Sequence, residues 1–153
     1  MKNLVVYFSK HGAAKRAVDF LNSKVKSDVV NVKEIGELEF NNYDNIVIAS
    51  SVYAGTISKE IKKFISNNYN ILKSKNIYFL IICGQESEIK NVLTNNFSEE
   101  QRNLFKKVIY GGFEFNFDSM NFIEKFITKK IAKVEKSVSN LNKKNIELLS
   151  EMI

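Results

Sequence analysis

The hydrophobic positions of the chain alternate between two spacings. Residues 4–8 form a continuous apolar run rich in β-forming side chains, and two later runs, residues 46–49 and 77–82, have the same character. After the first run, apolar side chains recur at helical spacing at Ala14, Val18, Leu21 and Val25. This pattern predicts strands that alternate with helices. The run at 77–82 is the strongest strand, and we expect it at the centre of the sheet.

Shorter signals fill the intervals between these runs. Residues 29–32 predict a short strand, and the polar stretch after it, with Gly36 and the pair Asn41-Asn42, predicts little regular structure. A helix is predicted by the apolar spacing of Ile57, Ile61, Phe64, Ile65 and Leu72. A further helical region carries Ile89, Val92 and Leu93.

The last third of the chain begins with a helix-start signal. Residues 98–101 have the spacing of a capping box, which predicts a short helix whose apolar face is Leu104 and Phe105. Residues 108–110 and 113–117 flank Gly111-Gly112 and predict a last strand with a kink or bulge. One long amphipathic helix is predicted beyond them by Met120, Ile123, Ile127, Ile131, Val134, Val138 and Leu141.

Five strands that alternate with helices predict a parallel sheet, because each crossover must return right-handed over the sheet. The fold class is therefore α/β, a doubly wound five-stranded parallel sheet with helices on both faces. The 153 residues suffice for one such domain, so we expect residues 1–153 to form a single domain. Periodicity does not determine the order of the strands.

Composition narrows the function classes. The N-terminal apolar run is too short for a signal peptide, and no run approaches the ~20 residues of a membrane span, so we expect a cytoplasmic protein. The single cysteine, Cys83, excludes an internal disulfide framework. With only one histidine as well, the chain offers little material for a zinc site, and we expect no metal.

The formal net charge is +6, and half of this excess lies in residues 119–153. A solvated, lysine-rich helix face explains it most simply. Zinc-finger spacing, an RNA-binding aromatic signature and an arginine cluster are all missing from the sequence, so we expect no nucleic-acid partner. Peripheral membrane or partner contact is the alternative for the C-terminal basic helix, where Phe122 and Phe126 stand among Lys125, Lys129 and Lys130.

Three glycines, Gly12, Gly55 and Gly84, fall just beyond the carboxyl ends of three apolar runs. Open α/β sheets bind their ligands at this edge, so three such loops are placed to enclose one small molecule. The first loop, Ser9-Lys10-His11-Gly12-Ala13-Ala14, leads into a helix N-terminus, which favours an anion such as phosphate. It has neither the spacing of a Walker loop nor that of a dinucleotide fingerprint.

The other two loops complete the candidate site. The second is Ser50-Ser51-Val52-Tyr53-Ala54-Gly55-Thr56, and the third is Cys83-Gly84-Gln85. Cys83 is interpreted as a small buried hydrophobe rather than a redox thiol, because no resolving cysteine exists. Two interpretations of His11 stay open: it is either a surface loop residue or a contact to the phosphate. Tyr53 is interpreted as a ligand platform, with a simple surface aromatic as the alternative.

These loops resemble those of the flavodoxin-like superfamily, in the branch that includes flavodoxin-type protoporphyrinogen oxidases. Ser9 and Gly12 match its phosphate loop, [ST]-x-T-G-x-T, while His11 and Ala14 stand where the family has threonines. The second loop and the helix after it match S-x-[IV]-Y-A-G-x-I-x-K, and the landmarks cover nearly the whole chain. The resemblance implies the strand order 2-1-3-4-5.

The resemblance also implies FMN as cofactor. Ser9 to Ala14 would then hold its phosphate, the ring of Tyr53 would pack on the flavin, and the backbone at Gly55 would contact the flavin N5. Val52, Ala54 and the third loop, Cys83, Gly84 and Gln85, would complete the contacts to the ring. The implied function is FMN-dependent electron transfer or a small oxidoreductase, with a redox partner protein or a quinone-type acceptor; no catalytic residue is assigned.

Two alternatives stay open. One is a protoporphyrinogen oxidase-like enzyme, and the other is a domain that has lost FMN and binds another anionic ligand or a protein partner. Typical flavodoxins are strongly acidic, whereas this chain is basic. We therefore expect a less negative low-potential flavin couple than in an acidic homologue.

Overall fold

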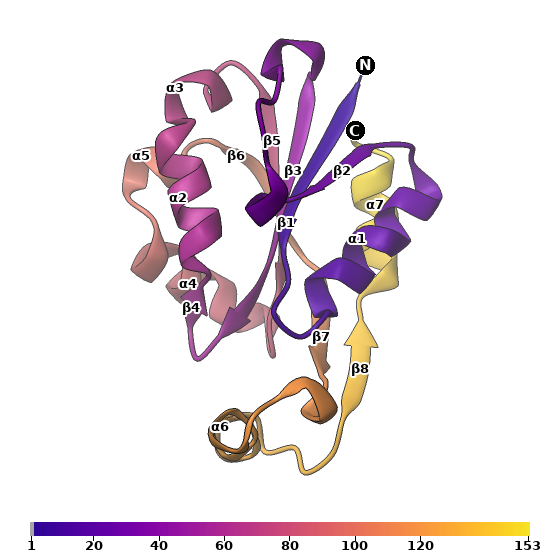
Figure 1. The fold of residues 1–153 in the computed structure, drawn as a ribbon, viewed down its shortest axis with the longest axis vertical. Coiled ribbons are helices and arrows are strands. Elements are labelled where there is room, and N and C mark those ends of the chain that lie inside the picture. Colours follow the sequence, from indigo (N-terminus) through magenta and orange to yellow (C-terminus); the bar gives the residue numbers. More distant parts are fainter. Residues whose placement is uncertain (1) are drawn as a thin grey trace.

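A computed structural model describes residues 2–153 and contains a central parallel sheet (Figure 1). The strand order is β2-β1-β3-β5-β6, which in chain order of the parallel strands is the expected 2-1-3-4-5. The strands are β1 (Asn3–Phe8), β2 (Asp28–Asn31), β3 (Asn45–Tyr53), β5 (Asn76–Ile82) and β6 (Phe105–Tyr110). The doubly wound α/β fold is confirmed. The apolar β5 is an interior strand, but β3, and not β5 as expected, lies at the centre of the sheet.

Helices cover both faces of this sheet (Figure 1). One face is covered by α1 (Ala13–Lys24) and α7 (Lys143–Ser150). The other face is covered by α2 (Lys59–Asn67), α3 (Tyr69–Leu72), α4 (Ile89–Asn96) and α5 (Glu99–Arg102). The predicted capping box is present at α5, where Ser98 and Gln101 exchange hydrogen bonds.

The alternation of side chains along β5 divides the core into two layers. Ile77, Phe79 and Ile81 pack against α2 and α4. Tyr78, Leu80 and Ile82 point to the opposite side and pack against α1 and α7. Because a strand buried on both faces must be apolar at every position, the continuous run at 77–82 marks an interior strand.

Several element boundaries differ from the expectations. The predicted helix over 57–72 is divided into α2 and α3, and Ile57 lies in β4 (Thr56–Ile57), which pairs antiparallel with β3. Phe105 does not lie on a helix: it begins β6 and packs edge-on against Phe97. The polar stretch after β2 contains two single turns of 3-10 helix, Val32–Glu34 and Phe40–Asn42.

The prediction of one long helix from Met120 to Leu141 is wrong. The chain forms α6 (Phe122–Ala132), then β8 (Val138–Leu141), and only then α7. β8 pairs antiparallel with β7 (Gly112–Phe115) in a separate two-stranded sheet, so the residues after Gly112 leave the main sheet instead of completing its last strand. Helix α6 ends at Lys133, which adopts a left-handed conformation.

We call residues 112–141 the arm. In Figure 1 the arm projects beyond the carboxyl ends of the parallel strands, with α6 at the far end of the molecule. The strands β7 and β8 connect α6 to the rest of the protein. Gly112 allows this departure, because a Cβ there would lie 2.3 Å from the carbonyl oxygen of Asn140. The arm thus lies at the sheet edge where α/β proteins bind ligands.

Candidate functional site

The first loop lies between β1 and α1. Gly12, at φ +93°, immediately precedes α1 at its N-cap position and provides no side-chain cap for the first helical turn. The hydroxyl oxygen of Ser9 is buried and has no hydrogen-bond partner among the described residues. A buried polar atom without a partner costs free energy unless a ligand completes it. Together with the unpaired N–H groups of a helix start, Ser9 favours an anion at this position.

The basic side chains of this loop are already engaged. His11 Nε2 lies 2.5 Å from Glu124 Oε2 on α6, and the ammonium of Lys10 lies 3.2 Å from the same oxygen. His11 Nδ1 lies 2.9 Å from the hydroxyl of Ser119. His11 is therefore not a free surface residue, which was one of the two readings from sequence. Its contacts fasten the arm to the first loop.

Glu124 is the residue on which these contacts converge. It is largely buried, and burial alone raises the pKa of its carboxyl. The hydrogen bonds from His11 and Lys10 and their positive charge lower it by more, so the pKa lies below the ordinary 4.5. At neutral pH, Glu124 is thus an internal anion held by the two basic side chains of the candidate phosphate loop.

The second loop is a tight hairpin between β3 and β4. Its two central residues, Ala54 at φ +48° and Gly55 at φ +74°, have the positive φ angles that a type I′ turn requires. For Ala54 this conformation is strained. Asn96, at the end of α4, braces the turn, because its amide donates to the carbonyl of Gly55 at 2.9 Å and its oxygen accepts from the amide of Ile57 at 3.0 Å.

Tyr53 stands at the start of this turn, where it faces the first loop. Its hydroxyl is buried and lacks a hydrogen-bond partner in the described part of the chain. Burial and the charge of Glu124 raise the pKa of its phenol. The ammonium of Lys10 lies 5.6 Å from the centre of its ring. The side chain of Tyr53 is thus partly buried beside the first loop, and its role as a ligand platform stays a prediction.

The third loop follows β5. Cys83 is 3% exposed and its thiol donates to the carbonyl oxygen of Gln85 at 3.2 Å. Burial and the nearby charge of Glu88 raise the pKa of this thiol to about 11. The sulfur stays protonated at neutral pH and is a poor nucleophile. The interpretation of Cys83 as a small buried hydrophobic side chain is confirmed.

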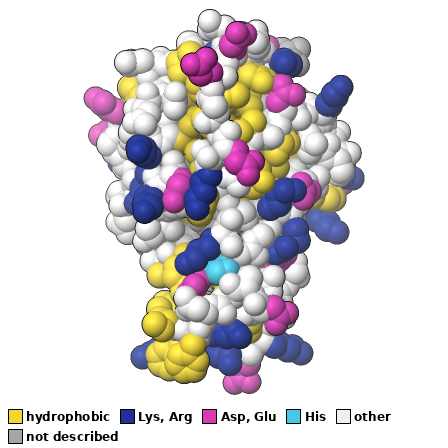
Figure 2. Space-filling view, viewed as in Figure 1, with side chains coloured by type: hydrophobic (Ala, Val, Ile, Leu, Met, Phe, Trp, Pro, Cys, Tyr) yellow, Lys and Arg dark blue, Asp and Glu magenta, His cyan; other side chains and the backbone are white. Residues whose placement is uncertain are grey.

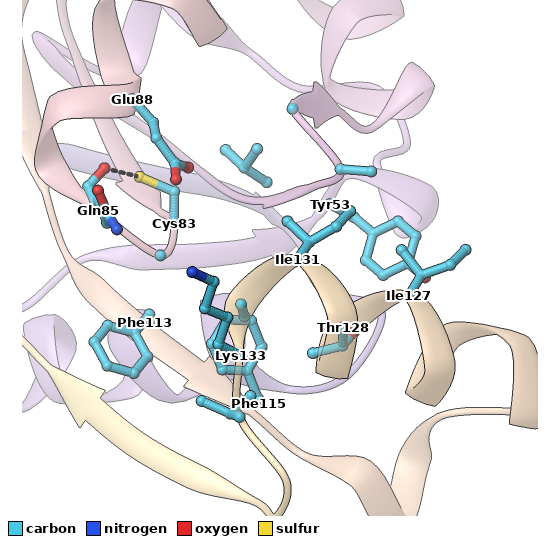
Figure 3. A pocket seen from close by; sticks show the side chains of 16 residues that line it. Tyr53, Cys83, Gln85, Glu88, Phe113, Phe115, Ile127, Thr128, Ile131 and Lys133 are labelled. Carbon is cyan, nitrogen blue, oxygen red and sulfur yellow. Dashed lines mark hydrogen bonds between the residues drawn. The ribbon is translucent and has the colours of Figure 1, made fainter.

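Two pockets open at this edge, and Tyr53 lines both. The Cys83 pocket, about 300 Å³, lies between the second and third loops and the inner side of α6, which contributes Ile127, Thr128 and Ile131 (Figure 3). The His11 pocket, about 340 Å³, lies between the first loop and β4. Both volumes are at the lower end of the range of small-molecule sites, about 300–1,000 Å³. The two pockets share Val52, Tyr53 and Phe115 in their linings.

Ten of the thirteen residues selected from sequence line these pockets: Lys10, His11, Ala13, Val52, Tyr53, Ala54, Gly55, Cys83, Gly84 and Gln85. Of the other three, Ser9 directly follows β1, and Gly12 and Ala14 lie at the start of α1. Ala14 is fully buried in the core beneath α1, so only its backbone is placed to contact a ligand.

Sequence reasoning missed the part of the site that belongs to the arm. Phe113 and Phe115 from β7, and Lys133 from the end of α6, line the Cys83 pocket. Glu124, also on α6, contacts Lys10 and His11 of the first loop. One signal was present: the run Ser137-Val138-Ser139-Asn140 contains poor helix formers, which disfavour a continuous helix. The contact of Glu124 with His11, 113 residues away, has no signal in any local pattern.

The fold, the three loops and the pockets define a flavodoxin-type protein. Residues 4–142 match the flavodoxin domain family, and the chain belongs to this family. Among proteins of known function, it is similar to protoporphyrinogen IX dehydrogenase (quinone) of Escherichia coli (strain K12), at 25% identity over 107 residues. That match spans 65% of this chain and only 59% of the length of the relative.

Solved structures share the fold at lower identity. A flavoprotein in complex with FMN from Lactobacillus acidophilus NCFM superposes with a TM-score of 0.58 at 17% identity, over 73% of this chain and 92% of its own. A WrbA-like flavodoxin from Agrobacterium tumefaciens gives 0.53 at 15% identity, over 88% of this chain and 96% of its own. A flavodoxin from the domain Archaea gives 0.53 at 19% identity, over 87% and 97%.

Proposed function

We propose that this protein binds FMN at the carboxyl edge of its sheet and transfers electrons through it. The observation that carries the proposal is the buried, unpartnered hydroxyl of Ser9 at the uncapped start of α1. A phosphate there would complete this hydroxyl and the N–H groups of the first helical turn. Family membership and an FMN complex among the structural neighbours support the same ligand.

The flavin ring fits the region around Tyr53. The Cys83 pocket is lined by apolar side chains of the arm on one side and by the backbone of Gly84 and Gln85 on the other. A planar, largely apolar ring with polar edges matches such a lining. When bound, FMN supplies the transfer of one or two electrons.

The chain's own residues would orient the cofactor and restrict water. The aromatic side chain of Tyr53 offers a platform, and Gly55 presents backbone without a Cβ at the turn. Ile127 and Ile131 on α6 cover the ring region from the side of the arm. Cys83 takes no part in electron transfer, because its thiol is buried and protonated.

Glu124 modifies the strength of the phosphate site. It holds the basic groups of His11 and Lys10, so a phosphate that recruits them must compete with this carboxylate. Glu124 does not engage the hydroxyl of Ser9 or the backbone N–H groups of the first turn of α1, so these donors do not have to be released from it. We therefore expect these groups, rather than His11 and Lys10, to supply most of the phosphate affinity.

Titration of the apoprotein with FMN and with riboflavin tests the proposal. The two ligands share the ring and differ in the phosphate, so their affinity ratio isolates the first loop. The proposal predicts quenching of flavin fluorescence by both, with markedly tighter binding of FMN. If neither ligand binds, the domain has lost the flavin and its edge serves another anionic ligand or a protein partner.

A second candidate, porphyrinogen oxidation with a quinone as electron acceptor, is favoured by the curated relative of that activity. The apolar lining of the Cys83 pocket is compatible with a large planar substrate next to the flavin. Anaerobic addition of protoporphyrinogen to the FMN-loaded protein should then bleach the flavin absorbance, and a quinone should restore it. A flavin that stays oxidised would reject this candidate and leave electron transfer to a redox partner.

A further inference from the structure

Helix α6 carries four of the exposed large hydrophobic side chains found among residues 2–153. Phe122 is 84% exposed, Ile123 67% and Phe126 60%, and Ile131 borders the Cys83 pocket. The two others, Leu148 and Met152, lie elsewhere and are less exposed. Apolar side chains gathered on one helix are typical of a binding surface, whereas single exposed ones are common on any protein.

The two sides of α6 differ sharply. Glu124 and Thr128 are buried toward the body of the protein, where Glu124 contacts the first loop. The α6 outer face, which we define as Phe122, Ile123, Lys125, Phe126, Lys129 and Lys130, points away from it. Figure 2 shows hydrophobic side chains gathered at the lower end of the molecule, with basic side chains beside them.

We propose that the α6 outer face binds an anionic lipid bilayer, with Phe122, Ile123 and Phe126 inserted among the headgroups. The positive charge of the α6 outer face favours an anionic partner. Three lysines flank the aromatic side chains, and the one carboxylate of α6, Glu124, is buried and paired with His11 and Lys10. An amphipathic helix with aromatic side chains on one side and lysines at its border is typical of interfacial binding.

A second copy of the chain fits this surface poorly. In a symmetric contact through α6, the three lysines of one copy would face those of the other and repel them. The shape of the arm also favours a bilayer over a second copy of the chain. Figure 1 shows α6 as the outermost element at one end of the molecule, where it can lie along a surface without interference from the body of the protein.

The inner side of the same helix lines the Cys83 pocket through Ile127 and Thr128. A bilayer on the outer face would therefore lie one helix away from this pocket, within reach of lipid-soluble molecules. The binding itself rests on the outer face alone and does not require the flavin. The lipid experiment thus stands or falls separately from the FMN proposal.

The chain contains no tryptophan, so a single introduced one reports on its own surroundings. We would compare Phe126→Trp with Leu148→Trp, which places the reporter on α7. The probes are vesicles of phosphatidylcholine alone and vesicles of equal parts phosphatidylcholine and phosphatidylglycerol. The proposal predicts a blue shift, and quenching by brominated acyl chains, for Phe126→Trp with the anionic vesicles only, and no change for Leu148→Trp.

Cosedimentation of variants measures the two contributions separately. The double change of Phe122→Ser and Phe126→Ser should lower vesicle binding more than tenfold, because two aromatic side chains lose their burial. Lys129→Glu with Lys130→Glu should lower it at least tenfold, because each lysine near an anionic surface contributes about fivefold. Lys143→Glu with Lys144→Glu, on α7, changes the net charge equally and should bind nearly as the wild type.

Three results would overturn the proposal. Equal loss of binding in the α6 and α7 charge variants would show attraction by net charge alone. Absence of wild-type binding to anionic vesicles would exclude the bilayer directly. Dimerisation in solution that the serine variants abolish, without vesicle binding, would assign the outer face to a second copy. All changed residues are exposed, and circular dichroism of each variant verifies that it is folded.

Discussion

The proposal of a phosphate site depends most directly on one atom, the hydroxyl oxygen of Ser9. Because its hydroxyl oxygen is buried without a partner, Ser9→Ala removes no hydrogen bond from the free protein. We expect the free energy of unfolding to stay the same or to rise by up to about 1–3 kcal/mol, because the variant no longer buries an unpartnered hydroxyl. FMN binding should weaken by about 1.5–3 kcal/mol, tenfold or more, because a hydrogen bond to a charged group is lost.

The measurement compares FMN and riboflavin titrations of the wild type and of Ser9→Ala. Riboflavin binding should stay unchanged, since it has no phosphate. If both ligands weaken equally, the hydroxyl supports the loop as a whole and does not contact the phosphate.

Glu124 makes the attachment of the arm sensitive to acid. Its pKa is lowered in the folded protein, so its contribution to stability is present above its ordinary pKa of 4.5 and is lost as the pH falls through the lowered value. Glu124→Gln should therefore lower the melting temperature at pH 7, and the difference from wild type should shrink as the pH falls below 4.5. Thermal unfolding followed by circular dichroism over this pH range provides the check.

The same variant should bind FMN more tightly, because Lys10 and His11 are released from the carboxylate. Glu147→Gln is the matched control: it removes an exposed carboxylate paired with Lys24 and should have little effect on either property. Equal FMN affinity in Glu124→Gln and wild type would mean that the two basic side chains stay apart from the phosphate.

At the scale of elements, the departure of β7 from the main sheet depends on Gly112. Its φ is +84°, and a Cβ would meet backbone atoms of Asn140 and Asn142 at 2.3 and 2.4 Å. Gly112→Ala should lower the free energy of unfolding by about 3 kcal/mol or more, since it adds strain to a clash that backbone cannot relieve. Gly36→Ala, with no atom near its added Cβ, should change it by less than about 0.5 kcal/mol.

Denaturant unfolding measures both variants. A Gly112→Ala protein as stable as Gly36→Ala would contradict the described path of the arm, because β7 and β8 pair directly at this position.

Elements of the central sheet were predictable because burial on both faces imposes a continuous apolar run, as at 4–8 and 77–82. The strand order came from the resemblance and not from periodicity. The arm was missed for a physical reason. Val134, Val138 and Leu141 keep helical spacing by coincidence, while the left-handed Lys133 and the pairing of β8 with β7 depend on tertiary contacts.

The candidate site was predictable to the extent that it consists of loops after strands. Gly12 and Gly55 stand where positive φ angles occur, and this sequence signal is local. Glu124 and Asn96 reach the site from distant elements, and only the fold brings them there. Ala54 is a further surprise, since nothing in its identity indicates a left-handed conformation.

At the scale of the whole molecule, the chain carries a net charge of +6. A surplus of positive charge favours added negative charge on a bound flavin. The low-potential couple of the bound cofactor should therefore lie at a less negative potential than in acidic flavodoxins, and the difference should shrink with added salt. A redox titration at two ionic strengths measures it, and an equally low potential at low salt would refute the charge argument.

No helix among residues 2–153 is long and apolar enough to cross a membrane. The lipid contact proposed above is a separate matter and involves the α6 outer face alone. The arm then joins two roles, since its inner side completes the Cys83 pocket and its outer side carries the exposed aromatic residues.

The central claim is that one flavin phosphate lies at the start of α1 while the ring lies around Tyr53. Backbone amide NMR of the isotope-labelled apoprotein, titrated with FMN and then separately with riboflavin, tests it most directly. FMN should shift the amides of the three loops, residues 9–14, 52–55 and 83–85, and those of the arm residues that line the Cys83 pocket. Riboflavin should shift the same amides except those of residues 9–14. No shifts at residues 9–14 with FMN, or shifts of residues 9–14 that riboflavin causes equally, would contradict the account.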